Sequence, residues 1–216
     1  YPARSEYYIN DAGNQIETLA ASANARYLEL FRQPAELPEN GYHGADIIDT
    51  AKRIVEKDGD RYLALPEEER LKVFREGALK EKLAALREDL SRFNVRFDVW
   101  FSERTLHPDK VADAIAKLRE NGTIYEKDGA LWLRSTDYGD DKDRVVIREN
   151  GEPTYLAADI AYHRDKFERG FGTLVDIWGA DHHGYVCRVK AAMKALGYDP
   201  EKLRILLLQM VSLYRG

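Results

Sequence analysis

One segment constrains this chain more than any other: a short apolar run that ends in glycine and a cluster of polar residues. Residues 173–177 read TLVDI, residues 178–186 read WGADHHGYV, and residues 188–196 have helical spacing. In an open parallel sheet, ligands bind outside the carboxyl ends of the strands, where helix N-termini also point. Glycine lets a ligand approach the backbone, and a carboxylate can accept hydrogen bonds from ribose hydroxyls. The segment therefore predicts a strand-to-helix junction at a ligand site.

The rest of the chain alternates between strand and helix patterns. We expect strands at 5–9, 95–101, 144–148, 173–178 and 203–211, and a hairpin of short strands at 123–125 and 130–133. We expect helices at 10–31, 47–55, 66–90, 108–120, 153–169 and 182–196. Asn10 or Asp11 is expected to cap the first helix, and Gly77 to interrupt the third. This order predicts an α/β fold with a small β-rich insertion, and the last two strands form a β-α-β unit with the helix between them.

Composition excludes several classes of protein. A net charge of −5 is unlike that of a free-standing nucleic-acid-binding domain, although a local basic patch could still contact RNA. No stretch approaches the ~20 apolar residues of a membrane span. The single cysteine, Cys187, excludes an internal disulfide and a zinc site of several cysteines, and it favours a reducing compartment, so we expect a cytoplasmic protein. The chain lacks an initiator Met, and we interpret it as a fragment of a longer protein.

Tyr155 and Asp159 lie four residues apart in a predicted helix and therefore share one face. Asp159 stands in a largely apolar context, where a carboxylate needs a partner, and a guanidinium offers a bidentate fork. The alternatives are a salt bridge to an arginine of the chain itself or a solvated turn. His163 follows on roughly the same face, where it could flank a pocket or simply lie on the surface.

The remaining polar clusters are less specific. His182 and His183 are adjacent and point in different directions on a helix, so they need Asp181 and a distant residue to hold a metal ion. A nucleotide-binding role beside Gly179 is at least as well supported as a core or capping role. Asn14 and Gln15 stand where a strand gives way to a helix, and capping by their neighbours does not explain them. They are candidates for lining the same cleft.

Five segments together resemble bacterial arginyl-tRNA synthetases, a class I aminoacyl-tRNA synthetase family with a Rossmann-type catalytic domain. They occur in the family's order and span nearly the whole chain: EYYINDAGNQ at 6–15, GYHG at 41–44, FDVWFSE at 97–103, YLAADIAYH at 155–163 and WGADHHGYV at 178–186. The resemblance implies a Rossmann-type parallel sheet with a helical excursion in residues 1–102. It implies a connective insertion at 103–152 and the second half of the Rossmann domain at 153–216.

The resemblance also implies an activity: L-arginine and ATP form arginyl-adenylate, and arginine is then transferred to tRNA(Arg), with Mg²⁺ accompanying ATP. Tyr155 and Asp159 match positions that hold the arginine guanidinium. ATP is supported by Gly179, Asp181 and His182, chiefly on its ribose side, and by Gln209, Met210 and Val211 near adenine. Asn14, Gln15 and His163 are candidate pocket-lining residues, and no catalytic residue and no metal ligand is assigned.

The chain departs from the family pattern, because we find no segment for the family's N-terminal tRNA-elbow domain or its helical anticodon-binding domain, and both ATP signatures are missing. The His-x-Gly-His and Lys-Met-Ser-Lys type signatures, which hold the ATP phosphates, do not occur in these 216 residues. Stabilisation of charge on the transferring phosphate is often the largest catalytic effect. We therefore expect the chain alone to be inactive in aminoacylation and, with strand edges exposed, to be able to self-associate. The alternatives are a non-catalytic nucleotide- or arginine-binding module and a metallohydrolase using Asp181, His182 and His183.

Overall fold

The computed structural model describes residues 2–212 and 214–215. Contacts divide the chain into two compact units, one ending at Arg104 and the other beginning at Thr105. Both contain helices and parallel strands, which agrees with the α/β class expected from the sequence. Within the described residues, no helix is both long and apolar enough to cross a membrane.

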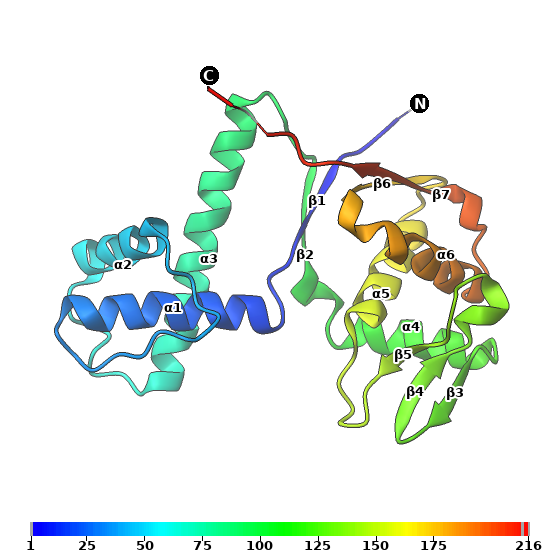
Figure 1. Ribbon diagram of the computed structural model, residues 1–216, viewed down its shortest axis with the longest axis horizontal. Helices are drawn as coiled ribbons and strands as arrows, with labels where there is room; N and C mark the ends of the chain where they lie inside the picture. The colour runs from blue at the N-terminus through cyan, green and yellow to red at the C-terminus, as the bar shows by residue number, and fades with distance from the viewer. Residues whose placement is uncertain (1, 213, 216) are drawn as a thin grey trace. The chain divides into compact units, whose positions relative to one another are not determined.

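The first unit combines a parallel strand pair with three helices. β1 (Glu6–Ile9) pairs in parallel with β2 (Val99–Ser102), and between them the chain forms α1 (Asn14–Leu30), α2 (Ala45–Asp58) and α3 (Glu67–Arg92). Figure 1 shows α1 lying across α3, with α2 beside it. Tyr27, Ile47 and Phe74 are fully buried where the three helices meet, and they form the core of this unit.

Three local expectations for the first unit are wrong. The predicted strand at 95–101 begins only at Val99. α3 runs through Gly77 without a break, since the helix extends from Glu67 to Arg92. The residue that precedes α1 is Gly13, and no side chain caps this helix. Instead, the Asp11 carboxylate accepts hydrogen bonds from the Ser102 hydroxyl at 2.6 Å and from the Arg104 amide at 3.1 Å.

The second unit begins with α4 (Asp109–Glu120) and an antiparallel sheet of β3 (Ile124–Lys127), β4 (Ala130–Leu133) and β5 (Arg144–Ile147). Asp128 and Gly129 join β3 to β4, and both have positive φ, at 52° and 74°. Two positive φ angles in a two-residue loop define the hairpin turn that Asp-Gly favours. The hairpin predicted from the sequence is therefore confirmed.

A parallel β-α-β unit completes the fold. α5 (Tyr155–Glu168) precedes β6 (Leu174–Gly179), and β6 pairs in parallel with β7 (Leu203–Leu208). The connection between them is a 3₁₀ helix at Ala180–Tyr185 followed by α6 (Val186–Ala195). The predicted helix therefore begins as a 3₁₀ turn, and the predicted strand 203–211 ends three residues early.

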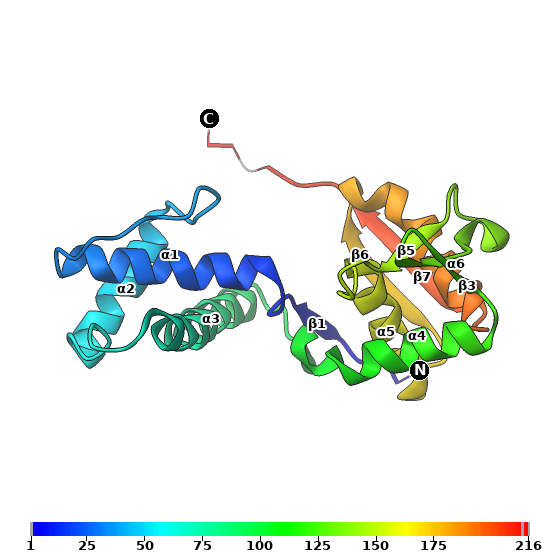
Figure 2. The same cartoon turned by 90° about the horizontal axis from the view of Figure 1, so that it is seen from below.

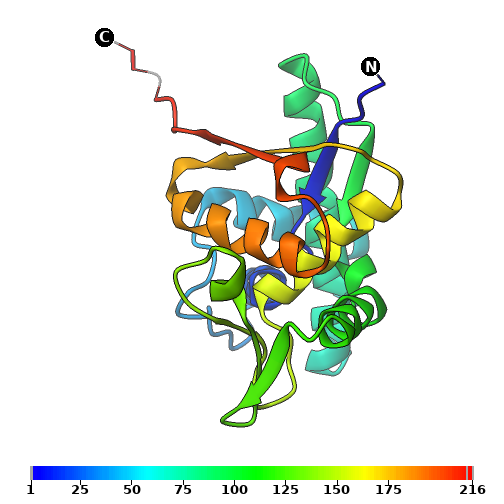
Figure 3. The ribbon, with the colours of Figure 1, turned by 90° about the vertical axis from the view of Figure 1, so that its right-hand side faces the viewer.

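Among the described residues of the second unit, helices cover one face of the β6–β7 pair. Figures 2 and 3 show α5 and α6 together on one side of these strands. Leu174 and Leu203 are buried, whereas the alternate side chains Val175, Ile177 and Leu206 are more than half exposed. Parallel sheets are normally buried on both faces, so this bare apolar face is unusual.

Candidate functional site

The start of α5 is the centre of the candidate site. Thr154 precedes the helix in an extended conformation, and its hydroxyl donates to the carbonyl oxygens of Val145 and Val146 at 3.0 and 3.3 Å. These bonds fix the helix N-terminus to β5. Tyr155 then projects outward with 60% of its surface exposed, and Asp159 follows one turn later in a partly buried position.

Asp159 is held by a tyrosine rather than by a cation. The Tyr185 hydroxyl donates to Asp159 Oδ2 at 2.5 Å. Burial raises the pKa of Asp159, and the hydrogen bond from Tyr185 offsets only part of this effect. Burial and the neighbouring Asp159 carboxylate also raise the pKa of the Tyr185 phenol, which therefore stays a donor. Across the described part of the chain Asp159 forms no ion pair, so the alternative of an internal salt bridge to arginine has no support.

A cavity of about 280 Å³ opens beside Tyr185, while Asp159 itself is not among the residues that line it. Its walls come from β5, the start of α5, the 3₁₀ helix and α6, and they combine two tyrosine rings with three guanidinium groups. The lining residues are Arg144, Val145, Arg148, Thr154, Tyr155, Leu156, Tyr185 and Arg188.

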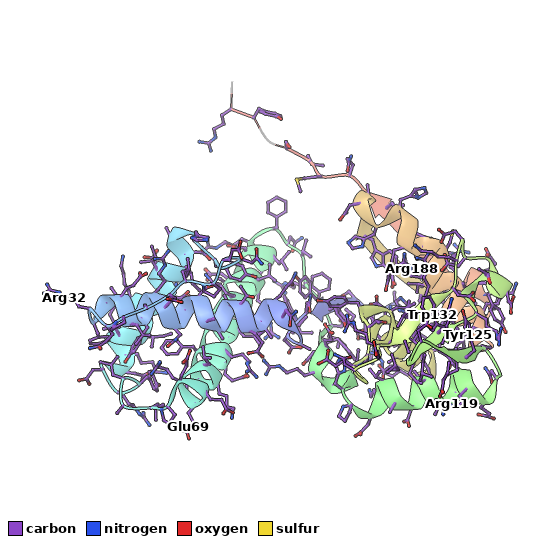
Figure 4. All side chains as sticks on the ribbon, turned by 60° about the horizontal axis from the view of Figure 1, so that its bottom comes forward. Arg32, Glu69, Arg119, Tyr125, Trp132 and Arg188 are labelled. Carbon is purple, nitrogen blue, oxygen red and sulfur yellow. The ribbon has the colours of Figure 1, made fainter. Side chains whose placement is uncertain are left out.

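Two of the three arginines in this cavity already have carboxylate partners. Arg144 pairs with Asp140 at 2.8 Å, and Arg148 lies 3.8 Å from Glu152. Arg188, labelled on α6 in Figure 4, lies with its guanidinium carbon 4.8 Å from the centre of the Tyr185 ring. Its Nε atom is buried and, among the described residues, has no hydrogen-bond partner. Arg188 is therefore suited to an anionic group of a ligand.

The site thus offers opposite charges on the two sides of one tyrosine. Tyr185 binds the Asp159 carboxylate through its hydroxyl and stacks under Arg188 through its ring. A ligand that carries both a cation and an anion can satisfy both groups, and a buried polar group left unsatisfied is costly.

His163 does not lie where the sequence suggested. It is only 2% exposed, so the alternative of a surface histidine is wrong, and it is not among the residues that line the cavity. Its Nε2 atom lies 2.5 Å from Asp176 Oδ2, and its Nδ1 atom lies 2.7 Å from the carbonyl oxygen of Asp159. His163 therefore contacts the backbone behind Asp159.

The proposed nucleotide residues gather at the carboxyl ends of β6 and β7. Gly179 is in register with Leu208, so Gln209 begins beside the turn that carries Asp181 and His182. Asp181 and His182 are exposed, with 3.6 Å between Asp181 Oδ2 and His182 Nε2. Met210 and Val211 follow β7 with 88% and 86% of their surface exposed.

Asp159 and Asp181 border the same short helix. Asp181 lies near the start of the 3₁₀ helix, and Tyr185, which binds Asp159, lies at its end. A 3₁₀ helix rises about 2 Å per residue, so these two ends are separated by roughly 8 Å along its axis. The two carboxylates therefore belong to one region of the second unit.

Asn14 and Gln15 belong to the first unit. They form the start of α1, and Gln15 Oε1 accepts a hydrogen bond from Asn10 Nδ2 at 3.1 Å. Their role as pocket-lining residues stays a prediction. Throughout the described residues, no group of three or more His, Cys, Asp or Glu side chains is arranged to hold a metal ion. The metallohydrolase alternative at Asp181, His182 and His183 thus gains no support.

Three residues of this region were not singled out from the sequence: Tyr185, Arg188 and Asp176. Tyr185 and Arg188 lie in or just after the glycine- and histidine-rich segment, but the partner of each becomes visible only once the 3₁₀ helix folds back on α5. Asp176 offered a clearer signal, because it is the one acid in the apolar strand 174–179. A carboxylate in a covered strand needs a buried cation.

Comparisons with known proteins agree on one family. Residues 8–211 match the model of the class I tRNA synthetase (R) catalytic domain. Arginine–tRNA ligases of Carboxydothermus hydrogenoformans and Bacillus cereus are 55% and 56% identical over the whole chain, which spans 39% of the length of each.

Solved structures give the same result. A protein from Campylobacter jejuni, assigned as an arginyl-tRNA synthetase, matches 96% of the chain with a TM-score of 0.88 and 44% identity, and 45% of its own length is covered. The Thermus thermophilus arginyl-tRNA synthetase matches 94% of the chain and 41% of its own length with a TM-score of 0.62. At 21% identity, this second match supports the fold alone.

Proposed function

Because the chain belongs to the catalytic-domain family of class I arginyl-tRNA synthetases, we propose that it forms the part of such an enzyme that binds L-arginine and ATP. The complete enzyme would join arginine to ATP as arginyl-adenylate with release of pyrophosphate. A hydroxyl of the terminal ribose of tRNA(Arg) would then accept the arginyl group as an ester, with release of AMP. The chain spans 39% of the curated relatives it matches, so the other steps depend on segments of those longer proteins.

Arginine recognition rests on the surroundings of Asp159. The partly buried carboxylate has Tyr185 on one oxygen and, among the described residues, no direct ion pair, which leaves it available to a guanidinium. Tyr155 borders the cavity and would contribute with Asp159 to holding the guanidinium end of the ligand. Arg188 supplies the opposite charge for the α-carboxylate of the amino acid. This pairing of charges around Tyr185 is the observation that carries the proposal.

ATP would bind at the strand ends of the second unit. Gly179 allows close approach of the ribose, Asp181 and His182 offer polar side chains, and the backbone at residues 209–211 reads the adenine edge. Phosphate stabilisation is not provided by these residues. Mg²⁺ would accompany ATP, bound through the phosphates.

The domain organisation follows the same proposal. Residues 1–102 form the first part of the catalytic domain, residues 103–152 the connective insertion, and residues 153–216 the second part. The antiparallel sheet of β3, β4 and β5 lies within the proposed insertion. Asn14 and Gln15 remain candidates for lining the pocket, whereas His163 lies behind Asp159 and does not line the cavity.

Calorimetry with L-arginine and L-citrulline tests the amino acid site. Citrulline has nearly the shape of arginine but a neutral side chain, so the wild-type chain should bind arginine more tightly. Asp159→Asn should remove this preference, at a cost of about 2–5 kcal/mol in arginine binding, the range for truncating one partner of a buried charge pair. Asp165→Asn, on the same helix, should preserve it. Equal affinity of the wild-type chain for both ligands would reject Asp159 as the guanidinium partner.

The catalytic limit of the chain has its own test. The purified chain, mixed with ATP, Mg²⁺, L-arginine and tRNA(Arg), should form no arginyl-tRNA, because the motifs that hold the ATP phosphates do not occur in its sequence. Measurable charging above a protein-free control would contradict this part of the proposal.

A further inference from the structure

Behind Asp159 lies a buried group of charges that the proposed function does not yet use. It consists of His163 and Lys166 on α5 and Asp176 on β6, and we call it the α5–β6 ion cluster. The side chains of these three residues are 2%, 10% and 11% exposed. Lys166 Nζ donates to Asp176 Oδ1 at 2.8 Å, while His163 Nε2 contacts Asp176 Oδ2 at 2.5 Å. Asp176 is thus held by a cationic partner on one oxygen and by an imidazole on the other.

The hydrogen-bond partners determine how the imidazole is used. His163 Nδ1 faces the Asp159 carbonyl oxygen, and Nε2 faces a carboxylate oxygen. Both of these partners are acceptors, so the arrangement is satisfied when each ring nitrogen carries a proton. The ring then donates in two directions and joins the backbone of Asp159 to the side chain of Asp176.

The charges in this region balance as a set. Asp159 and Asp176 are acidic, Lys166 is cationic, and the His163 ring adds a second positive charge in the form that donates to both acceptors. The pKa of Asp176 is held far below its usual range by the hydrogen bond and charge of His163 and by Lys166, which together outweigh its burial. The charges of His163 and Lys166 lower the pKa of Asp159, and the charge of Asp176 raises it. If the cluster lost a cation, Asp159 would face an uncompensated carboxylate.

The cluster also links two parts of the proposed site. Asp159 and His163 are one helical turn apart on α5. Asp176 lies on β6, three residues before Gly179, where the proposed ATP segment begins. Burying charged groups is unfavourable unless they are paired, and apolar side chains of similar size can stabilise a helix–strand contact equally well. Packing of α5 against β6 alone therefore does not explain why His163, Lys166 and Asp176 are charged residues.

From this geometry, we propose that His163 and Asp176 are positioning residues for Asp159: His163, anchored by Asp176, fixes the turn of α5 that presents the Asp159 carboxylate to the arginine guanidinium. This rests on the proposed function in so far as Asp159 is the guanidinium partner. Neither residue is among those that line the cavity, and their link to it runs through Asp159, whose carboxylate accepts the hydrogen bond of the cavity-lining Tyr185.

Two substitutions of His163 separate its two hydrogen bonds. In His163→Asn the side-chain amide can replace Nδ1 and donate to the Asp159 carbonyl, but it is too short to reach Asp176. In His163→Gln the amide can replace Nε2 and donate to Asp176, but the bond to the carbonyl is lost. Asp165→Asn is the matched control, because Asp165 is also buried on α5 and pairs with Arg169 at 2.8 Å, but it has no contact with Asp159.

The first readout is the ratio of L-arginine to L-citrulline affinity, measured by calorimetry at a temperature where each variant is folded. We expect both His163 variants to lower this ratio by about tenfold, because the carboxylate is no longer fixed, and Asp165→Asn to leave it unchanged. A purely structural role for His163 would lower thermal stability without changing the ratio. An unchanged ratio in both folded His163 variants, against a wild-type chain that prefers arginine, would overturn the proposal.

The second readout needs no ligand. In chain labelled with ¹³C-tyrosine, the ring signal of Tyr185, assigned through Tyr185→Phe, reports the hydrogen bond to Asp159. We expect this signal to shift in His163→Asn and His163→Gln and to stay in place in Asp165→Asn. A wild-type chain that does not prefer arginine contradicts the proposed function, while the Tyr185 signal still decides the positioning role. If the Tyr185 ring signal does not move in the His163 variants, the positioning role of His163 is rejected, whatever the ligand-binding result.

Discussion

At the scale of single residues, Asp159 is placed where the protein does not favour its charge. Burial raises its pKa, and the neighbouring Tyr185 supplies a hydrogen bond without a positive charge. A carboxylate in this state gains most from a cationic ligand. Because it is buried, ionised Asp159 lowers the stability of the ligand-free protein. Residues that serve binding often have such a stability cost.

Ionised Asp159 should destabilise the folded chain at neutral pH. A raised pKa means that the folded chain holds the proton of Asp159 more tightly than the unfolded chain. The stability associated with the protonated form is present at low pH and is lost as pH rises through the raised pKa. Asp159→Asn should therefore increase the free energy of unfolding at pH 7 by about 1 kcal/mol. Urea denaturation at pH 7 measures it, with Asp199→Asn as the control, and a clear loss of stability would contradict this explanation.

Asp176 should respond in the opposite direction. Its pKa is lowered in the folded chain, so its contribution to stability is present above the ordinary carboxyl value and is lost as pH falls through the lowered pKa. Asp176→Asn leaves His163 and Lys166 buried without their carboxylate. Removing one partner of a buried ion pair costs about 3–5 kcal/mol, and denaturation at neutral pH should show a loss of this size. A loss well below this range would show that the cluster is not an important ionic contact.

At the scale of secondary structure, the sequence predicts most elements but fewer of their ends. The hairpin was predictable because Asp128 and Gly129 are suited to its turn. β7 stops at Leu208 although the apolar run continues, because pairing with β6 ends at Gly179 and only tertiary structure reveals that limit. Asp11 looked like a helix cap, but it bonds to Ser102 and Arg104, more than ninety residues away in sequence.

In the candidate site as well, some features could be predicted from the sequence and others could not. The spacing of Tyr155 and Asp159 placed both on one helix face, and the structure agrees. Nothing in the local pattern around His163 marks it as buried, because its partner Asp176 lies on the following strand. The contact of Tyr185 with Asp159 likewise depends on how a 3₁₀ turn meets α5. Sequence periodicity therefore predicts the helices and strands but not the contacts between them.

Gly77 should lower the stability of α3. It lies inside α3 with its surface exposed, and a Cβ atom built there meets nothing within 4 Å. Glycine in a helix interior is less favourable than alanine by about 1 kcal/mol, so Gly77→Ala should stabilise the chain by that amount. Gly59→Ala is the control, because Gly59 ends α2 at a φ of 62° that alanine rarely adopts, and it should destabilise. If Gly77→Ala lowers the denaturation midpoint, the glycine has a role in α3 that the helix geometry does not explain.

At the scale of the whole chain, the bare face of the β6–β7 pair stands out. Val175, Ile177, Leu206 and Leu208 are 51–65% exposed on adjacent parallel strands. Sheets of this kind are normally covered on both faces, and the curated relatives are longer than this chain, which spans 39% of their length. Within the described residues of the second unit, these four side chains therefore form an exposed apolar surface.

The isolated chain should self-associate through the exposed face of β6 and β7. Exposed apolar side chains on a strand pair favour association between copies, so sedimentation velocity should show a concentration-dependent rise in the average sedimentation coefficient. Ile177→Thr combined with Leu206→Thr should suppress the rise, because threonine keeps strand propensity while reducing apolar surface. Val73→Thr, on the exposed surface of α3, should leave the rise unchanged. If the wild-type chain sediments as a monomer at every concentration, the face is not a site of self-association. If Val73→Thr suppresses the rise as strongly as the double variant, association does not depend on the β6–β7 face.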